Sequence, residues 1–184
     1  RLSGRCKSAM KSVSLHVIIS ALITLSFSAW AQGNVAIEAE AGLITPPFSV
    51  TNGYVFQTAG TNLASSGRAV YDIAISQPGG YVIVVTVSSP DHASSLAVNV
   101  DAEPTGPTMI WDIPTSQAFT NRIVTWRGSE SSTAKVPGQK VFNLTPGSHQ
   151  IIMRGGDDAG ARIDRFSIAR IPAPPGNFRI VATP

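Results

Sequence analysis

Cysteine is almost absent from this sequence. The single cysteine among 184 residues, Cys6, lies before the first long apolar segment, and none follows. Its absence excludes a disulfide framework, a cysteine-ligated zinc site and a thiol nucleophile from the main part of the chain. A domain of this length can still bury a sizeable hydrophobic core without such cross-links.

The chain also lacks an excess of positive charge once residues 1–31 are set aside. The whole sequence has 14 basic and 11 acidic residues. Four of the basic residues and none of the acidic ones lie within residues 1–31, which leaves ten basic against eleven acidic residues and a net charge of −1. A basic surface for nucleic acid is therefore excluded as the leading interpretation.

Residues 10–31 have the features of a cleaved secretory signal. A positively charged start precedes the apolar residues 17–27, and Ala29-Trp30-Ala31 supplies the small-x-small pattern of a cleavage site. The alternative is a membrane anchor, but this apolar segment is shorter than the roughly 20 residues that a spanning helix needs. We predict cleavage after Ala31, secretion and no stable membrane insertion, with residues 1–9 ahead of the expected start codon.

The other end of the chain is rich in proline. Residues 172–176 have the composition of a stiff linker. After them, residues 177–181 begin to alternate like a strand, which is similar to the first strand of a fibronectin type III module. A disordered tail is the alternative. We predict that residues 172–184 lead into covalently linked C-terminal domains.

Residues 33–171 are predicted to form one all-β domain. No segment shows the periodicity of an amphipathic helix, and turn residues such as Pro78-Gly79-Gly80 separate short apolar or alternating segments. Their number and spacing favour a two-sheet antiparallel β-sandwich, or jelly roll, with the polar residues 129–138 as a surface excursion. The expected strands are residues 35–41, 70–75, 81–87, 96–101, 123–126, 140–144, 149–154 and 163–168.

Three carboxylates occur on the first and last of these strands. Side chains alternate along a strand, so Glu38 and Glu40 are expected on one face, about 6.5–7 Å apart. Asp164 is expected to look inward, and the first and last strands of a sandwich commonly lie side by side. A shared cation would remove the repulsion, and an all-oxygen ligand set indicates calcium. The alternative is that the glutamates face solvent and that Asp164 pairs with Arg162 or Arg165.

Five short segments carry a family resemblance through their order along the chain. They are I-E-A-E at 37–40, P-G-G-Y at 78–81, L-A-V-N-V-D at 96–101, F-N-L-T-P-G-S-H-Q-I at 142–151 and I-D-R-F at 163–166. The ordered set, which spans nearly all of residues 35–171, resembles the family 6 and family 35 carbohydrate-binding modules. The resemblance implies a galactose-binding-like β-jelly roll. It also implies a structural, non-catalytic calcium ion held by Glu38, Glu40 and Asp164.

The resemblance further implies a site where aromatic rings stack on sugar rings, while polar side chains bind the hydroxyl groups. Aromatic residues are sparse beyond residue 31, and core packing is the alternative for either tryptophan. The candidate stacking residues are Trp111, Trp126 and Tyr54, and the candidate polar residues are Asn121, Asp157 and Asp158.

Signatures of catalysis are missing. The sequence has no Gly-x-Ser-x-Gly, no His-Glu-x-x-His and no glycine-rich phosphate loop. Glu38 and Glu40, expected on one strand face, do not suit the opposed carboxylates of a glycosidase. We therefore predict a non-catalytic module that binds a polysaccharide or glycan within a longer secreted protein, for example as the ancillary module of a glycoside hydrolase. The alternative is a calcium-stabilised structural or adhesion module without sugar binding.

Overall fold

The computed structural model describes residues 35–127 and 138–172, which belong to a unit spanning Gln32–Pro184. The predicted signal segment lies outside the described residues, as do the predicted surface excursion except for Gly138 and the predicted linker except for Pro172. Within the described ranges, no helix is both long enough and apolar enough to cross a membrane.

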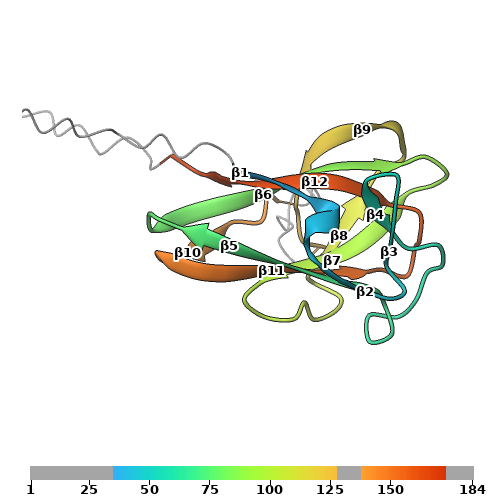
Figure 1. The fold of residues 1–184 in the computed structure, drawn as a ribbon, viewed down its shortest axis with the longest axis horizontal. Coiled ribbons are helices and arrows are strands. Elements are labelled where there is room, and N and C mark those ends of the chain that lie inside the picture. The colour runs from blue at the N-terminus through green and yellow to red at the C-terminus, as the bar shows by residue number, and fades with distance from the viewer. Residues whose placement is uncertain (1–34, 128–137, 173–184) are drawn as a thin grey trace, which may run out of the picture. The chain divides into compact units, whose positions relative to one another are not determined.

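The described residues form two antiparallel sheets, which confirms the predicted β-sandwich (Figure 1). The strands of the larger sheet are β1 (Val35–Glu38), β3 (Ser49–Thr51), β4 (Tyr54–Phe56), β6 (Gly79–Ser89), β9 (Ser116–Ile123), β10 (Phe142–Leu144) and β12 (Arg162–Arg170). The strands of the smaller sheet are β2 (Leu43–Thr45), β5 (Arg68–Ile75), β7 (Ser94–Val100), β8 (Ile110–Ile113) and β11 (Gly147–Gly155).

The order of the strands places the ends of the domain together. The larger sheet runs β10-β6-β12-β4-β3, with β1 also paired to β12 and β9 to β6, and the smaller runs β2-β5-β11-β7-β8. Val35 lies opposite Ile168, and Glu38 lies opposite Arg165. Figure 1 shows the blue β1 along the red β12. The expectation that the first and last strands lie side by side is therefore confirmed.

The hydrophobic core lies between the two sheets. Alternate residues of β6, namely Tyr81, Ile83, Val85 and Val87, are at most 3% exposed, and they belong to one cluster with residues of β11 such as Met153. Burial of each such side chain contributes about 1.5–3 kcal/mol. β-branched residues suit such a strand because they pack well on a pleated surface.

The first strand is shorter than predicted. β1 ends at Glu38, and the 3₁₀ turn η1 (Ala39–Ala41) follows it. Ala39 is fully buried, and the hydroxyl group of Tyr71 donates a 2.8 Å hydrogen bond to its carbonyl oxygen. Burial, helped by the charge of Glu40, raises the pKa of Tyr71, so its hydroxyl stays a donor. The expected alternation of Glu38 and Glu40 along one strand was therefore wrong.

The last strand has a β-bulge at Asp164. The register of β12 against β6 shifts between Ile163 and Arg165. Ile163 and Phe166 are both buried, at 0% and 1% exposure, which simple alternation does not allow. The bulge leaves the Asp164 and Arg165 side chains 27% and 50% exposed, respectively. The expectation that Asp164 shares the inward face of Phe166 was therefore wrong.

The structure confirms most, but not all, of the other predicted strands. Six of them correspond to β5, β6, β7, β10, β11 and β12. The prediction of a strand at residues 123–126 was wrong, because Ile123 ends β9 and Thr125 forms only an isolated bridge to Gln139. The sequence analysis missed β2, β3, β4 and β8, and most of β9.

Candidate functional site

A cavity of about 240 Å³ opens where β4 and β12 meet the loop after β6. Tyr54 and Phe56 of β4 supply its aromatic lining. Asp91 and His92, both exposed on the loop between β6 and β7, supply polar groups together with Arg162 at the start of β12. The cavity therefore combines ring surfaces with hydrogen-bonding side chains.

Three aromatic rings gather beside this cavity, and we call Tyr54, Phe56 and Phe119 the aromatic cluster. The centroid of the Tyr54 ring lies 5.6 Å from that of Phe56 and 6.0 Å from that of Phe119, with tilted or edge-on geometry. Phe119, on β9, is 41% exposed, and Tyr54 and Phe56 are half-buried. Rings held in this way present apolar surface at a fixed position.

Arg162 lies against the Tyr54 ring of this cluster. Its guanidinium carbon is 5.7 Å from the centroid of the Tyr54 ring, within the range of a cation–π interaction. Among the residues that the structure describes, no hydrogen-bond or ion-pair partner holds this guanidinium. Its N–H groups are therefore available to an oxygen-rich ligand in the cavity, and Asp91 offers acceptor oxygens nearby.

The two predicted tryptophans lie elsewhere. Trp111, on β8, is 2% exposed and belongs to the core, so its ring is closed to a ligand and its assignment as a stacking residue was wrong. Trp126 is half-buried, and its indole N–H donates a 2.9 Å hydrogen bond to the carbonyl oxygen of Val98. The Lys140 ammonium lies 3.8 Å from the Trp126 ring centroid, and Phe142 packs edge-on against that ring.

The three predicted polar residues are also dispersed. Asn121 accepts a 2.8 Å hydrogen bond from Thr86 and lines a different cavity, of about 330 Å³, together with Asp164 and Arg165. Asp157 and Asp158 are exposed, and they help to raise the pKa of Arg127, whose main partner is Asp112. Of the six predicted ligand residues, Tyr54 alone lies in the cavity beside the aromatic cluster.

The three predicted metal ligands lie around an arginine. The Arg165 Nε donates a 2.9 Å hydrogen bond to Asp164 and lies 3.9 Å from a carboxylate oxygen of Glu38. The hydrogen bond with Asp164, then the charges of Glu38 and Asp164, and more weakly Glu40, raise the pKa of Arg165. The alternative in which Asp164 pairs with Arg165 is therefore the one observed.

The donor chemistry of these carboxylates suits calcium, but their arrangement does not. In the described ranges, no group of three or more histidine, cysteine, aspartate or glutamate side chains is placed to hold a metal ion. In the arrangement that the structure shows, Glu38, Glu40 and Asp164 therefore do not fit a calcium ion. Calcium binding stays a prediction.

Sequence reasoning missed Phe56, Phe119 and Arg162. Phe119 had only a weak signal, because Phe119 and Ile123 fall on one face of a strand but the polar Asn121 lies between them on that face. Arg162 had none, since its position beside Tyr54 depends on the pairing of β12 with β4. The site is made by contacts between segments that are distant along the chain.

The fold and the site define an all-β module with an aromatic-lined surface cavity. No model of a protein family and no curated protein matches the sequence. Solved structures do resemble it. A family 35 carbohydrate-binding module from Clostridium thermocellum is 15% identical over 76% of this chain and 99% of its own, with a TM-score of 0.54.

Two further structures show the same likeness. The C-terminal CBM6 of LamC, a marine laminarinase from Zobellia galactanivorans, is 15% identical over 75% of this chain and 100% of its own, with a TM-score of 0.51. The GH26-CBM35 β-(1,4)-mannanase of Podospora anserina is 16% identical with a TM-score of 0.54, and the match covers 78% of this chain but 29% of the mannanase. The chain therefore has the fold of family 6 and family 35 carbohydrate-binding modules.

Proposed function

We propose that residues 33–171 form a non-catalytic carbohydrate-binding module that binds a polysaccharide or glycan at the aromatic cluster and its cavity. The observation that carries the proposal is the position of the Tyr54 ring, which lies against the Phe119 ring and beside the guanidinium of Arg162. Sugar rings present apolar C–H faces to aromatic rings, and their hydroxyl groups accept from arginine and donate to carboxylates.

The fold likeness supports the same function. The neighbours include modules named as carbohydrate-binding, among them a mannan-binding module that is 13% identical with a TM-score of 0.51. Some neighbours are parts of longer enzymes, and this chain spans 29% of the mannanase that it matches. We propose that the module is secreted after cleavage at Ala31 and that further domains follow it.

A structural module without sugar binding is the second candidate. The burial of Trp111 and the packing of Trp126 against Lys140 and Phe142 favour it, because both tryptophans then serve the fold. The aromatic cluster favours the first candidate, because a 41% exposed phenylalanine beside a half-buried tyrosine places aromatic surface where a ligand can reach it.

Binding to soluble and insoluble polysaccharides tests the proposal. The full chain should be retained on at least one of mannan, β-1,3-glucan and galactan, measured by affinity electrophoresis and pull-down. Tyr54→Ala and Phe119→Ala should each weaken binding about tenfold, since each removes a stacking ring. Far-ultraviolet circular dichroism should show that both variants keep the fold.

Ile123→Ala is the matched control. Ile123 is 40% exposed and lies on the same strand, β9, as Phe119, but it does not line the cavity. It should bind as the wild type does. If a wider glycan array also gives no binding by the wild type, or if Tyr54→Ala and Phe119→Ala bind normally, the structural module becomes the better assignment.

A further inference from the structure

Gln57 is a buried polar residue at the edge of the cavity. It follows β4, is 3% exposed, and uses both ends of its amide. Its Nε2 donates hydrogen bonds to the carbonyl oxygen of Ala59 at 2.6 Å and to the hydroxyl of Thr61 at 3.2 Å. Its Oε1 accepts a 2.8 Å hydrogen bond from the backbone N–H of Gly67. A buried amide with donors and acceptor satisfied fixes the groups around it.

These hydrogen bonds close the segment between β4 and β5 into a loop. The segment that leads from β11 to β12 is hydrogen-bonded to this loop. The backbone N–H of Gly160 donates to the carbonyl oxygen of Gln57 at 3.3 Å, that of Thr61 to Gly156 at 3.2 Å, and that of Gly155 to Gly67 at 3.0 Å. Both segments line the cavity, through Thr58 on one side and Ala159 and Gly160 on the other. The shape of the cavity therefore depends on how the two segments meet.

Two glycines make that meeting possible. A Cβ atom at Gly155 would overlap the Gln57 side-chain amide, and one at Gly60 would overlap the carbonyl group of Asp157. At Gly60 the two backbones approach closely, and at Gly155 the backbone lies against the buried Gln57 amide, so a residue without a side chain fits at each position. One close packing of the two segments is thereby specified.

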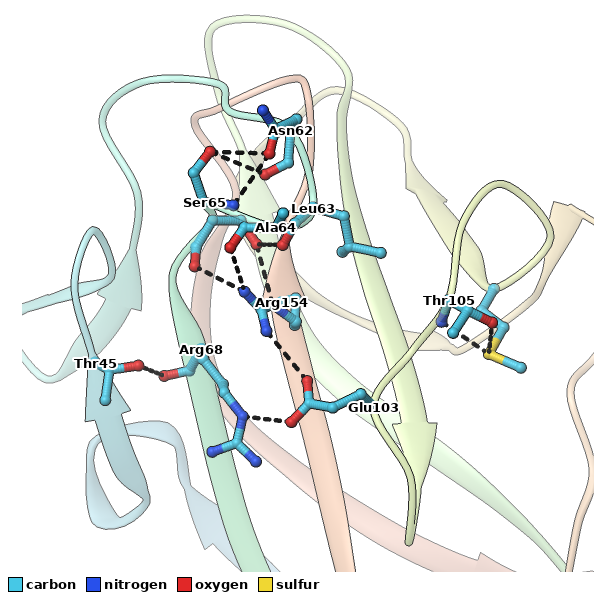
Figure 2. A network of polar contacts seen from close by, with 11 residues as sticks. Thr45, Asn62, Leu63, Ala64, Ser65, Arg68, Glu103, Thr105 and Arg154 are labelled. Carbon is cyan, nitrogen blue, oxygen red and sulfur yellow. Dashed lines mark hydrogen bonds and ion pairs between the residues drawn. The ribbon is translucent and has the colours of Figure 1, made fainter.

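Arg154 fastens the far side of the loop. It donates to the Ser66 hydroxyl and to the Ala64 carbonyl, each at 3.3 Å, and to Glu103 at 3.2 Å. Figure 2 shows its guanidinium pointing to Ala64 and Glu103, with Glu103 also held by Arg68. The loop is therefore held at Gln57 on one side and at Arg154 on the other.

We propose that Gln57 is a positioning residue that holds the wall of the glycan-binding cavity in its binding shape. The inference rests on the proposed function, because it assigns a role within that site. A wall that is ordered before the glycan arrives does not lose conformational entropy on binding, so affinity is higher than for a mobile loop.

Gln57→Glu tests the role with almost no change of shape. At pH 7 the carboxylate cannot donate to the Ala59 carbonyl, and the loop should loosen. At pH 5 the buried carboxyl group takes up a proton and donates again. Relative to wild type at the same pH, affinity for the polysaccharide that retains the full wild-type chain should fall about tenfold at pH 7 and return to within about twofold at pH 5. The ratio to wild type cancels the effects of Asp91, His92 and Arg162, which line the same cavity.

Gln77→Glu is the control for this experiment. Gln77→Glu makes the same charge change at an exposed position outside the cavity and should bind as wild type at both pH values. Circular dichroism should show that Gln57→Glu is folded at both. No binding by the wild type to any polysaccharide overturns the proposed function. If the wild type binds and Gln57→Glu binds equally well at pH 7, the positioning role alone is overturned. The same holds if Gln57→Glu is folded at pH 5 but still binds weakly there.

Discussion

His149 joins two loops through a charge on its ring. Its Nδ1 lies 2.6 Å from an Asp101 carboxylate oxygen, and its Nε2 lies 2.8 Å from the carbonyl oxygen of Thr145. Both neighbours are acceptors, so the doubly protonated ring fits best. The hydrogen bond with Asp101, followed by that with Thr145, raises the pKa of His149. Although burial opposes it, hydrogen bonds from His149 and the backbone of Gln150 lower the pKa of Asp101.

The stability of the fold should therefore depend on pH through this pair. The contribution of His149 is complete below its unfolded pKa of about 6.5 and is lost as pH rises through the higher folded value. The contribution of Asp101 to stability is lost as pH falls through its lowered folded pKa. The pair therefore stabilises the fold most between about pH 4 and 6.5. From pH 6 to pH 9, wild type should lose about 1 kcal/mol more unfolding free energy than His149→Gln, a small value because Asp101 is 49% exposed.

Urea unfolding at several pH values measures this difference. His92→Gln, which changes an exposed histidine, should keep the wild-type pH dependence. An equal loss in wild type and His149→Gln would show that the pair adds nothing to stability.

At this same scale, the sequence could identify the aromatic residues but could not sort them. Tyr54 and Trp111 both sit in apolar surroundings along the chain, yet one lines a cavity and the other is core. The exposure of each ring depends on which strand packs over it. The residues next to it along the chain do not indicate that packing. Tyr54 was predicted as a ligand residue because aromatics are few, whereas Phe119 and Arg162 reach it only through the folded sheet.

At the scale of elements, the pairing of β1 with β12 places Arg165 among three carboxylates. It contacts Asp164 and lies opposite Glu38, so its charge offsets part of their repulsion. Without this guanidinium the carboxylates should favour an added cation. We expect the rise in melting temperature between EDTA and millimolar calcium chloride to be larger for Arg165→Gln than for wild type.

Arg170→Gln is the control for that measurement, since Arg170 lies on the same strand but donates to the carbonyl oxygen of Pro78. It should respond to calcium as wild type does. An equal response in all three proteins would contradict the competition by Arg165. No response in any of them would remove calcium from the interpretation of Glu38, Glu40 and Asp164.

Elements differ in how well the sequence predicts them. β6 was predicted because it is a run of mostly β-branched residues, most of them buried, and a strong turn precedes it. β9 was largely missed because it is mostly exposed, so polar residues interrupt its apolar alternation. The bulge at Asp164 could not be predicted, since one additional residue reverses which side chains face inward.

At the scale of the whole molecule, the described residues, which lie between 35 and 172, include two sheets and a shared core cluster. A protein limited to residues 33–172 should therefore unfold in one cooperative transition. Its melting temperature should lie within about 2 °C of that of residues 33–184, since both proteins contain every residue of the described core cluster. Differential scanning calorimetry measures both, and a clearly lower value or a broadened transition for the shorter protein would show that residues 173–184 complete the fold.

β12 runs from the proposed glycan-binding cavity to the part of the sheet where β1 begins. The strand begins at Arg162, against the aromatic cluster, and ends at Arg170, beyond the point where Val35 enters the sheet opposite Ile168. Eight steps along a strand span about 25 Å. A partner domain tethered at the entry and exit points would thus lie away from the proposed glycan-binding cavity. The cavity would then stay free to meet a surface too large to enter any cleft.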